Sequence, residues 1–216
     1  MSQLIEQMKM DLSLMNYSPK TIMAYTYHIK KFLETVQKPA ESVTSDDIKC
    51  YLYEMKNARK WSQSNLSQAF SGIKFLYRKT LDMPLQLSDV KTRQRGRKLP
   101  VVLSCEEVKR LLSCLDNMKH KTILMTIYSA GLRLSEATAL KVPDIDSHRM
   151  QIRVEQGKGK KDRYTLLSRV LLSELRHYWR HYKPRTWLFP NRQQTRPINP
   201  ATVQRIFHHA KKKPAS

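Results

Sequence analysis

Apolar and polar positions alternate along residues 1–80 at the spacing of amphipathic helices. Apolar side chains recur every three or four residues, which places them on one face of a helix. Ser18-Pro19 precedes the second such stretch and Thr44 or Ser45 precedes the third, and these residue types begin helices. The pattern predicts four helices with short connections, which favours an antiparallel bundle. The predicted inward residues are, helix by helix, Leu4, Ile5, Met8, Leu12 and Met15; Ile22, Tyr25, Ile29, Phe32, Leu33 and Val36; Ile48, Leu52 and Met55; and Leu66, Phe70, Ile73, Phe75 and Tyr77.

The second half of the chain combines helices with one pair of strands. Ser104 and Glu107 have the spacing of a capping box, and the apolar run 123–128 predicts a buried helix. Residues 150–154 and 163–167 alternate as strands and predict an antiparallel hairpin. The predicted fold class is therefore mainly α with a small antiparallel β-sheet. The other predicted core positions are Val108, Leu111, Leu112 and Leu115; Val170, Leu171, Leu175, Tyr178 and Trp179; the stop Trp187-Leu188-Phe189-Pro190; and, in a helix starting at Asn199-Pro200, Val203, Ile206 and Phe207.

Positive charge is concentrated in the second half. Residues 1–90 contain 12 Lys and Arg against 9 Asp and Glu, whereas residues 91–216 contain 28 against 9. The whole chain carries a net charge of +22 and has a pI near 10.1. A field of this strength attracts a polyanion, and release of counterions from nucleic acid is the usual source of binding. We therefore expect a nucleic-acid partner; a solvated basic surface without one is the alternative.

Cysteine usage and hydropathy predict a compartment. Cys50, Cys105 and Cys114 lie in helical patterns without CxxC spacing, so we expect reduced, mostly buried thiols, neither a zinc site nor a disulfide framework. No apolar run approaches the length of a membrane span, and the N-terminus lacks the apolar segment of a signal peptide. The expectation is a cytoplasmic, nucleoid-associated protein with no membrane partner.

Several motifs in the second half occur together over about 70 residues, and this combination resembles the tyrosine recombinase (phage integrase) family, near its Xer and integron-integrase branch. The resemblance implies a SAM-like core-binding domain over residues 1–82, a basic linker over 83–98, and the first part of the catalytic domain over 99–216. The motifs are the run from Arg97 to Ser104, Ala130-Gly131-Leu132-Arg133-Leu134-Ser135-Glu136, Leu140 with Asp144-Ile145-Asp146, and Gly157-Lys158-Gly159.

Two residues are candidates for catalysis. We expect Arg133 to be a buried Arg at the head of a helix, where its guanidinium can hold two phosphate oxygens in a planar fork. In the family the matching Arg contacts the scissile phosphate, and Glu136 can orient Arg133 from the same helix face. A simple ion pair at a helix start is the alternative, and both can hold together. Lys158 matches the hairpin lysine that donates a proton to the leaving 5′ oxygen.

The resemblance also implies contacts to duplex DNA, within a tetramer of recombinase subunits and without a metal or another cofactor. Ser18, Thr21, Tyr25 and Phe32 resemble the core-binding domain, although charges between apolar positions there also fit a solvated helix face. Lys160 and Lys161 could substitute for Lys158 or bind the backbone. The predicted DNA-binding residues are Lys20, Thr21, Lys74, Arg78, Arg93, Arg95, Arg97, Lys160, Lys161 and Arg163.

Three other polar motifs favour structural explanations. His177 and Arg180 have the HxxR spacing of the second catalytic box, but the surrounding amphipathic pattern indicates an exposed pair on a helix. Asp144 and Asp146 are typical of turn carboxylates or partners of a nearby Arg rather than of metal ligands. His208-His209 precedes Lys instead of the required Arg, which indicates a basic helix surface.

The family's second box and nucleophilic tyrosine have no match in this sequence. No tyrosine follows Tyr182, and Tyr164 has the pattern of a strand residue. Covalent cleavage would then lack its first step, so we expect a truncated chain that is inactive alone. The alternatives are a DNA-binding protein that occupies recombination sites or interferes with a full-length recombinase, and a general nucleic-acid binder. Truncation would expose apolar surface and weaken the second half around Leu124, Ile127, Val203 and Phe207.

Overall fold

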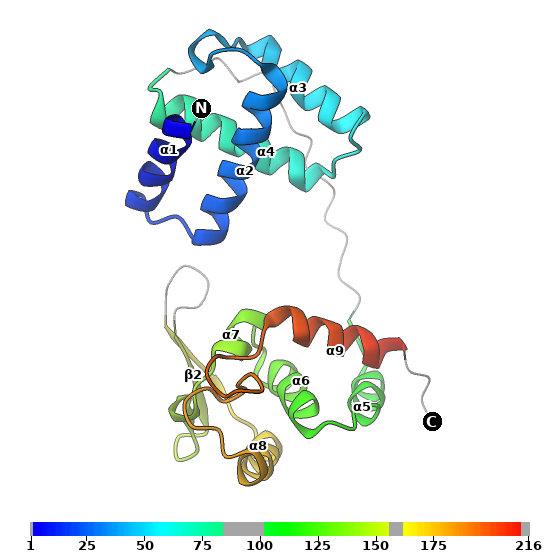
Figure 1. Ribbon diagram of the computed structural model, residues 1–216. Helices are drawn as coiled ribbons and strands as arrows, with labels where there is room; N and C mark the ends of the chain where they lie inside the picture. Colours follow the sequence, from blue (N-terminus) through cyan, green and yellow to red (C-terminus); the bar gives the residue numbers. More distant parts are fainter. Residues whose placement is uncertain (1, 84–101, 156–161, 213–216) are drawn as a thin grey trace. The chain divides into compact units, whose positions relative to one another are not determined.

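The computed structural model describes residues 2–83, 102–155 and 162–212 (Figure 1). The chain divides into two compact units, Met1–Leu99 and Pro100–Ser216. Helices dominate both units, and the described part of the second unit holds one antiparallel sheet, which confirms the predicted fold class. The predicted linker, 83–98, lies outside the described residues except for its first residue.

The first unit is a helical bundle whose helices begin at capping side chains. Ser18 accepts a hydrogen bond from the Thr21 N–H, while Thr44 and Asp47 form a reciprocal capping box. These contacts satisfy N–H groups that have no partner inside a helix. The elements are α1 (Ser2–Leu14), α2 (Pro19–Val36), the 3-10 helix η1 (Ala40–Ser42), α3 (Ser45–Asn57), α4 (Gln63–Phe75) and the π-helical turn η2 (Leu76–Thr80).

The core of the first unit lies where α2 packs against α1 and α4. Phe32 and Ile29 of α2 are completely buried there, as the apolar spacing predicts. Tyr77, in the π-helical turn, is also buried, and its hydroxyl donates to the Ala40 carbonyl at 2.9 Å. That bond satisfies a polar group inside the core and ties η2 to η1.

A buried histidine should make the stability of this unit depend on pH. His28 packs against Trp61, and burial lowers the pKa of His28 below its usual 6.5; a hydrogen bond with Gln68 opposes the shift and the charge of Lys31 adds to it. The unfolded chain then binds a proton that the folded chain does not, so the stabilisation is complete above pH 6.5 and is lost as the pH falls below it.

This pH dependence can be checked by urea unfolding at about pH 7.5 and at about pH 5, with hydrogen exchange of α2 as the readout. The urea midpoint of α2 should be lower at the acidic pH in the native chain, and it should change less in His28→Gln. Equal pH dependence in both chains would contradict the assignment to His28.

The second unit surrounds a small sheet with helices. The strands β1, β2 and β3 form an antiparallel sheet in that order, with Ile145 opposite Ile152 and Ile152 opposite Thr165. The hairpin pair was predicted, whereas β1 was interpreted as a turn. The elements are α5 (Cys105–Ser113), α6 (Met118–Ala130), α7 (Leu134–Ala139), the 3-10 helix η3 (Val142–Asp144), β1 (Ile145–Asp146), β2 (Gln151–Val154), β3 (Arg163–Leu166), α8 (Arg169–Tyr182) and α9 (Pro200–Lys212).

Helix α9 covers apolar surface that was predicted to be exposed. It packs against α5, α6 and α7, and Figure 1 shows it running from α7 past α6 towards α5. Leu124 and Val203 are therefore buried, while Ile127 and Phe207 are half-buried against the same core. The prediction of uncovered surface at Leu124 and Val203 was wrong, because the apolar face of α9 supplies the cover itself.

Other side chains are more exposed than predicted. Cys50 and Cys105 are exposed and Cys114 is half-buried, so the expectation of mostly buried thiols was wrong. Apolar periodicity locates the centre of a buried stripe but not its width, and residues at its edge meet solvent. The exposed residues of the predicted stripes are Met15, Tyr128, Val170 and Trp179. None of the helices in the described ranges combines the length and apolar character that a membrane span needs.

Candidate nucleic-acid interface

Arg133 lies at the start of α7, directly after the end of α6. Gly131 ends α6 with φ of 61°, a left-handed conformation that glycine adopts without a Cβ penalty. Leu132 then enters the core and Arg133 occupies the N-cap position of α7. The Arg133 side chain is 54% exposed, so the prediction of a buried Arg was wrong. Its exposure leaves the guanidinium accessible to a ligand in solution.

A buried carboxylate fixes this guanidinium. The Glu136 side chain is 5% exposed and binds Arg133 twice, through the Arg133 N–H at 2.7 Å and Nη1 at 2.6 Å. Its Oε2 also accepts a hydrogen bond from Arg163 Nη2 at 2.8 Å. Burial alone would raise the pKa of Glu136, but these hydrogen bonds and the charge of Arg163 outweigh it and lower the pKa. An ionised Glu136 thus holds two guanidinium groups side by side.

Arg163 connects this cluster to the strand that follows the hairpin. It is the first residue of β3, and two residues later Thr165 Oγ1 donates to the Ala130 carbonyl at 2.8 Å. The structure therefore brings together three of the predicted residues, Arg133, Glu136 and Arg163. The other predicted residues of the hairpin and linker, Lys158, Lys160, Lys161, Arg93, Arg95 and Arg97, lie outside the described residues.

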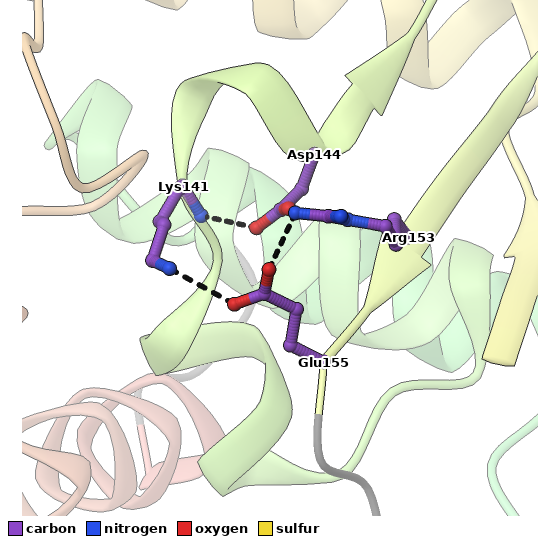
Figure 2. Close-up of polar contacts among 4 residues, drawn as sticks. All are labelled: Lys141, Asp144, Arg153 and Glu155. Atoms are coloured by element: carbon purple, nitrogen blue, oxygen red, sulfur yellow. Dashed lines mark hydrogen bonds and ion pairs between the residues drawn. The ribbon is translucent and has the colours of Figure 1, made fainter. Parts of the chain in front are cut away.

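A second charged cluster lies at the other end of α7, and sequence reasoning had not assigned it to the site. Figure 2 shows Lys141 reaching Glu155, with Asp144 and Arg153 beside them. Lys141 Nζ lies 2.9 Å from Glu155 Oε2, and Arg153 contacts both Asp144 and Glu155. The interpretation of Asp144 as a partner of a nearby Arg is confirmed. Asp144 follows Lys141 by three residues, as Glu136 follows Arg133, and this repeated spacing could have revealed the contact between Lys141 and Asp144.

Predicted DNA-binding residues of the first unit lie at helix ends. Lys20 is exposed in the first turn of α2, next to Thr21, whose hydroxyl is 2.9 Å from the Ser18 hydroxyl. Lys74 Nζ lies 4.4 Å above the Phe70 ring, and Arg78 is exposed in η2. These cations are accessible at the surface of the bundle, so contact with DNA is sterically possible for them.

The other polar motifs that the sequence suggested lie on a helix surface or in a turn. His177 and Arg180 are exposed on α8, as their pattern predicts. Asp146 accepts hydrogen bonds from the Arg149 N–H at 2.8 Å and from the Arg149 guanidinium at 3.3 Å. No group of three or more His, Cys, Asp or Glu side chains in the described ranges is arranged to hold a metal ion.

Two family models match this chain. The model of the phage integrase family matches residues 102–215, and the model of the phage integrase N-terminal SAM-like domain matches residues 4–87. The chain belongs to the phage integrase family. The resemblance carried by the motifs around Arg133 is thereby confirmed, and the SAM-like match supports the predicted class of the first unit.

Curated proteins that resemble this chain are named as integrases or recombinases. The chain is 39% identical to the putative integrase/recombinase y4qK of Sinorhizobium fredii, over 92% of this chain and 65% of that protein. It is 31% identical to the tyrosine recombinase XerA of Pyrococcus horikoshii, over 94% of this chain and 70% of that protein. The chain spans about two thirds or less of the first curated relatives it matches, 65% and 61%.

Solved structures share the fold. A lambda integrase tetramer bound to a Holliday junction matches with a TM-score of 0.78 at 15% identity, over 98% of this chain and 62% of that chain. The XerH recombinase bound to palindromic difH substrate matches with a TM-score of 0.72 at 19% identity, over 93% of this chain and 66% of that chain. At these identities the likeness concerns the fold.

Proposed function

We propose that this chain binds duplex DNA and holds the scissile phosphate of a site-specific recombination reaction through Arg133 and Lys158. The observation that supports the proposal most is the setting of Arg133. Its guanidinium is half-exposed, yet a buried, ionised Glu136 fixes its position and also binds Arg163 at the foot of the hairpin. A fixed cation that reaches solvent is what an incoming phosphate requires.

Each residue has a distinct proposed role. Arg133 neutralises the charge that gathers on the phosphate oxygens during strand transfer, so a metal ion or another cofactor is not needed for that step. Lys158 donates the proton that the leaving 5′ oxygen needs, because an alkoxide leaving group has a conjugate acid of high pKa. Glu136 positions Arg133. None of these side chains supplies the hydroxyl that attacks the phosphate.

The proposed partners are double-stranded DNA and further recombinase subunits. The excess of 28 Lys and Arg over 9 Asp and Glu in residues 91–216 supports DNA as the ligand. Relatives of the same fold were solved as a tetramer on a Holliday junction and as a dimer on a core site, which supports assembly on DNA. In this proposal residues 1–82 are the core-binding domain, 83–98 the basic linker and 99–216 part of the catalytic domain.

Replacing Arg133 with alanine should weaken binding to duplex DNA by about tenfold and reduce the salt dependence of log K by about one unit, because one phosphate contact is lost. Arg180→Ala, which removes an exposed Arg from α8, is the matched control and should change affinity less. Fluorescence anisotropy across a salt series, with footprinting, measures both. Indistinguishable effects of the two substitutions would remove Arg133 from the phosphate site.

A nicked suicide substrate tests the chemistry separately. Because the proposed roles of Arg133, Lys158 and Glu136 include no attacking hydroxyl, the chain alone should bind DNA without forming a covalent adduct. Denaturing electrophoresis detects such an adduct directly. A covalent product would assign the attacking hydroxyl to one of the ten tyrosines of this chain, and peptide mapping would identify which.

A further inference from the structure

The start of α7 and the start of η3, the 3-10 helix that follows it, carry the same arrangement of charged groups. Arg133 and Lys141 are each followed three residues later by a carboxylate, Glu136 and Asp144, whose side chains are only 5% and 3% exposed. Each carboxylate accepts the backbone N–H of its basic residue, at 2.7 Å and 2.8 Å. Arg133 and Glu136 thereby cap the start of α7, and Lys141 and Asp144 cap the start of η3, the 3-10 helix that follows α7.

Each buried carboxylate also binds one arginine of the sheet. Glu136 accepts a hydrogen bond from Arg163 of β3 at 2.8 Å, and Asp144 accepts one from Arg153 of β2 at 3.3 Å. The two strands are direct neighbours in the sheet. One pocket of about 390 Å³ is lined by Glu136, Lys141, Asp144 and Glu155, so both clusters border the same space. The segment from α7 to η3 thus contacts both strands of the hairpin, β3 through Glu136 and β2 through Asp144.

Apolar packing holds β2 through its own side chains, but it holds β3 only through Leu167, the buried residue that directly follows it. Ile152 and Val154 of β2 are completely buried in the core. By contrast, no side chain of β3 is buried, and Tyr164 and Leu166 are 65% and 78% exposed. Arg163 and Thr165 of β3 also form hydrogen bonds, to Glu136 and to the Ala130 carbonyl. Charged groups at the base of the two strands therefore add to the apolar contacts that hold them.

Glu155, the last described residue before residues 156–161, belongs to this charged base of the hairpin. Glu155 directly follows β2, and its two carboxylate oxygens are held separately, one by Lys141 and the other by Arg153. The Lys141 and Glu155 side chains are each 36% exposed, so the pair borders solvent while Asp144 anchors it from within. Glu155 stands three residues before Lys158, and Arg163 stands five residues after it.

We infer that Lys141 and Glu155 are positioning residues that set the hairpin lysine Lys158 relative to Arg133. This inference rests on the proposed function of Arg133 and Lys158. The pair fixes the β2 side of the hairpin to the start of η3, while Glu136 and Arg163 fix the β3 side to the start of α7. The segment from α7 to η3 then serves as the common support for both phosphate-binding groups.

The experiment compares Glu155→Gln, the charge reversal Lys141→Glu with Glu155→Lys, and the control Glu106→Gln, which neutralises an exposed carboxylate in α5. Hydrogen exchange mass spectrometry of peptides across residues 151–166 is measured without DNA. Affinity for a fluorescein-labelled duplex of mixed sequence is measured at fixed salt, in the native and Lys158→Ala backgrounds.

Glu155→Gln should speed exchange across the hairpin by about threefold and weaken DNA binding by about threefold. Loss of a negative charge would by itself strengthen binding to DNA, so a weaker complex is specific to lost positioning. The binding loss should vanish in the Lys158→Ala background. The charge reversal should restore both readouts only in part, because a cation at position 155 lies beside Arg153. Glu106→Gln should change neither.

Unchanged exchange in Glu155→Gln would overturn the inference. So would a binding loss of equal size with and without Lys158, or tighter binding that shows Lys141 to be a direct phosphate contact released from its partner. If Lys158→Ala and Arg133→Ala themselves leave affinity unchanged, the proposed function fails. The exchange data then still decide whether Lys141 and Glu155 fix the hairpin.

Discussion

Replacing Glu136 with alanine should destabilise the second unit by about 2–3 kcal/mol and abolish most of the effect of Arg133 on DNA binding. The change removes the acceptor of the Arg133 N–H and of two guanidinium groups, and it leaves Arg133 and Arg163 close together without an intervening negative charge. Because both guanidiniums keep access to water, with side chains 54% and 37% exposed, the cost is smaller than for a fully buried pair.

Urea unfolding and DNA titration of the same variant check this prediction. Glu136→Gln keeps the shape and one acceptor, so it should fall between the native chain and Glu136→Ala. Glu106→Ala, at an exposed position of α5, serves as the control. A Glu136→Ala chain as stable as the control would show that the carboxylate does not hold the two arginines.

The pH dependence supplies an independent test of the same contact. Since the folded-state pKa of Glu136 lies below the usual 4.5, its stabilisation is present above pH 4.5 and is lost as the pH falls through the lowered value. The difference in stability between the native chain and Glu136→Gln should therefore shrink on acidification.

Replacing Phe32 with alanine should cost the first unit about 3–5 kcal/mol, because a completely buried ring leaves a cavity that its neighbours fill only in part. The Phe32 ring lies 5.1 Å from that of Tyr51, edge to face, so this aromatic contact is lost as well. Met23→Ala, on the same helix at a position 71% exposed, should change stability by less than about 0.5 kcal/mol.

A urea series with pulsed hydrogen exchange measures this effect, because it reports α2 separately from α8. The expected result is a lower urea midpoint for α2 in Phe32→Ala and a nearly unchanged midpoint in Met23→Ala. Similar midpoints in the two variants would show that the predicted inward face of α2 does not hold the core.

Local sequence signals located most elements and the candidate phosphate site. The capping residues Ser18, Thr44 and Ser104 begin α2, α3 and α5 as predicted, since a cap depends on neighbours within three residues. Gly131, Arg133 and Glu136 were recognised as one motif for the same reason. The short strand β1 was missed, because a strand of two residues has no periodicity and exists only through its pairing with β2.

The chain's own pattern therefore determined the helices, the hairpin pair, the family and the pairing of Arg133 with Glu136, all of which depend on residues close in sequence. Only the tertiary structure revealed that Glu136 also binds Arg163, that Asp144 and Glu155 share Arg153, and that α9 buries Leu124. The Asp144–Arg153 and Glu136–Arg163 contacts join residues 9 and 27 positions apart, and no local spacing specifies them. Folding brings those charges together, because a buried carboxylate requires a cation from whichever strand the sheet places beside it.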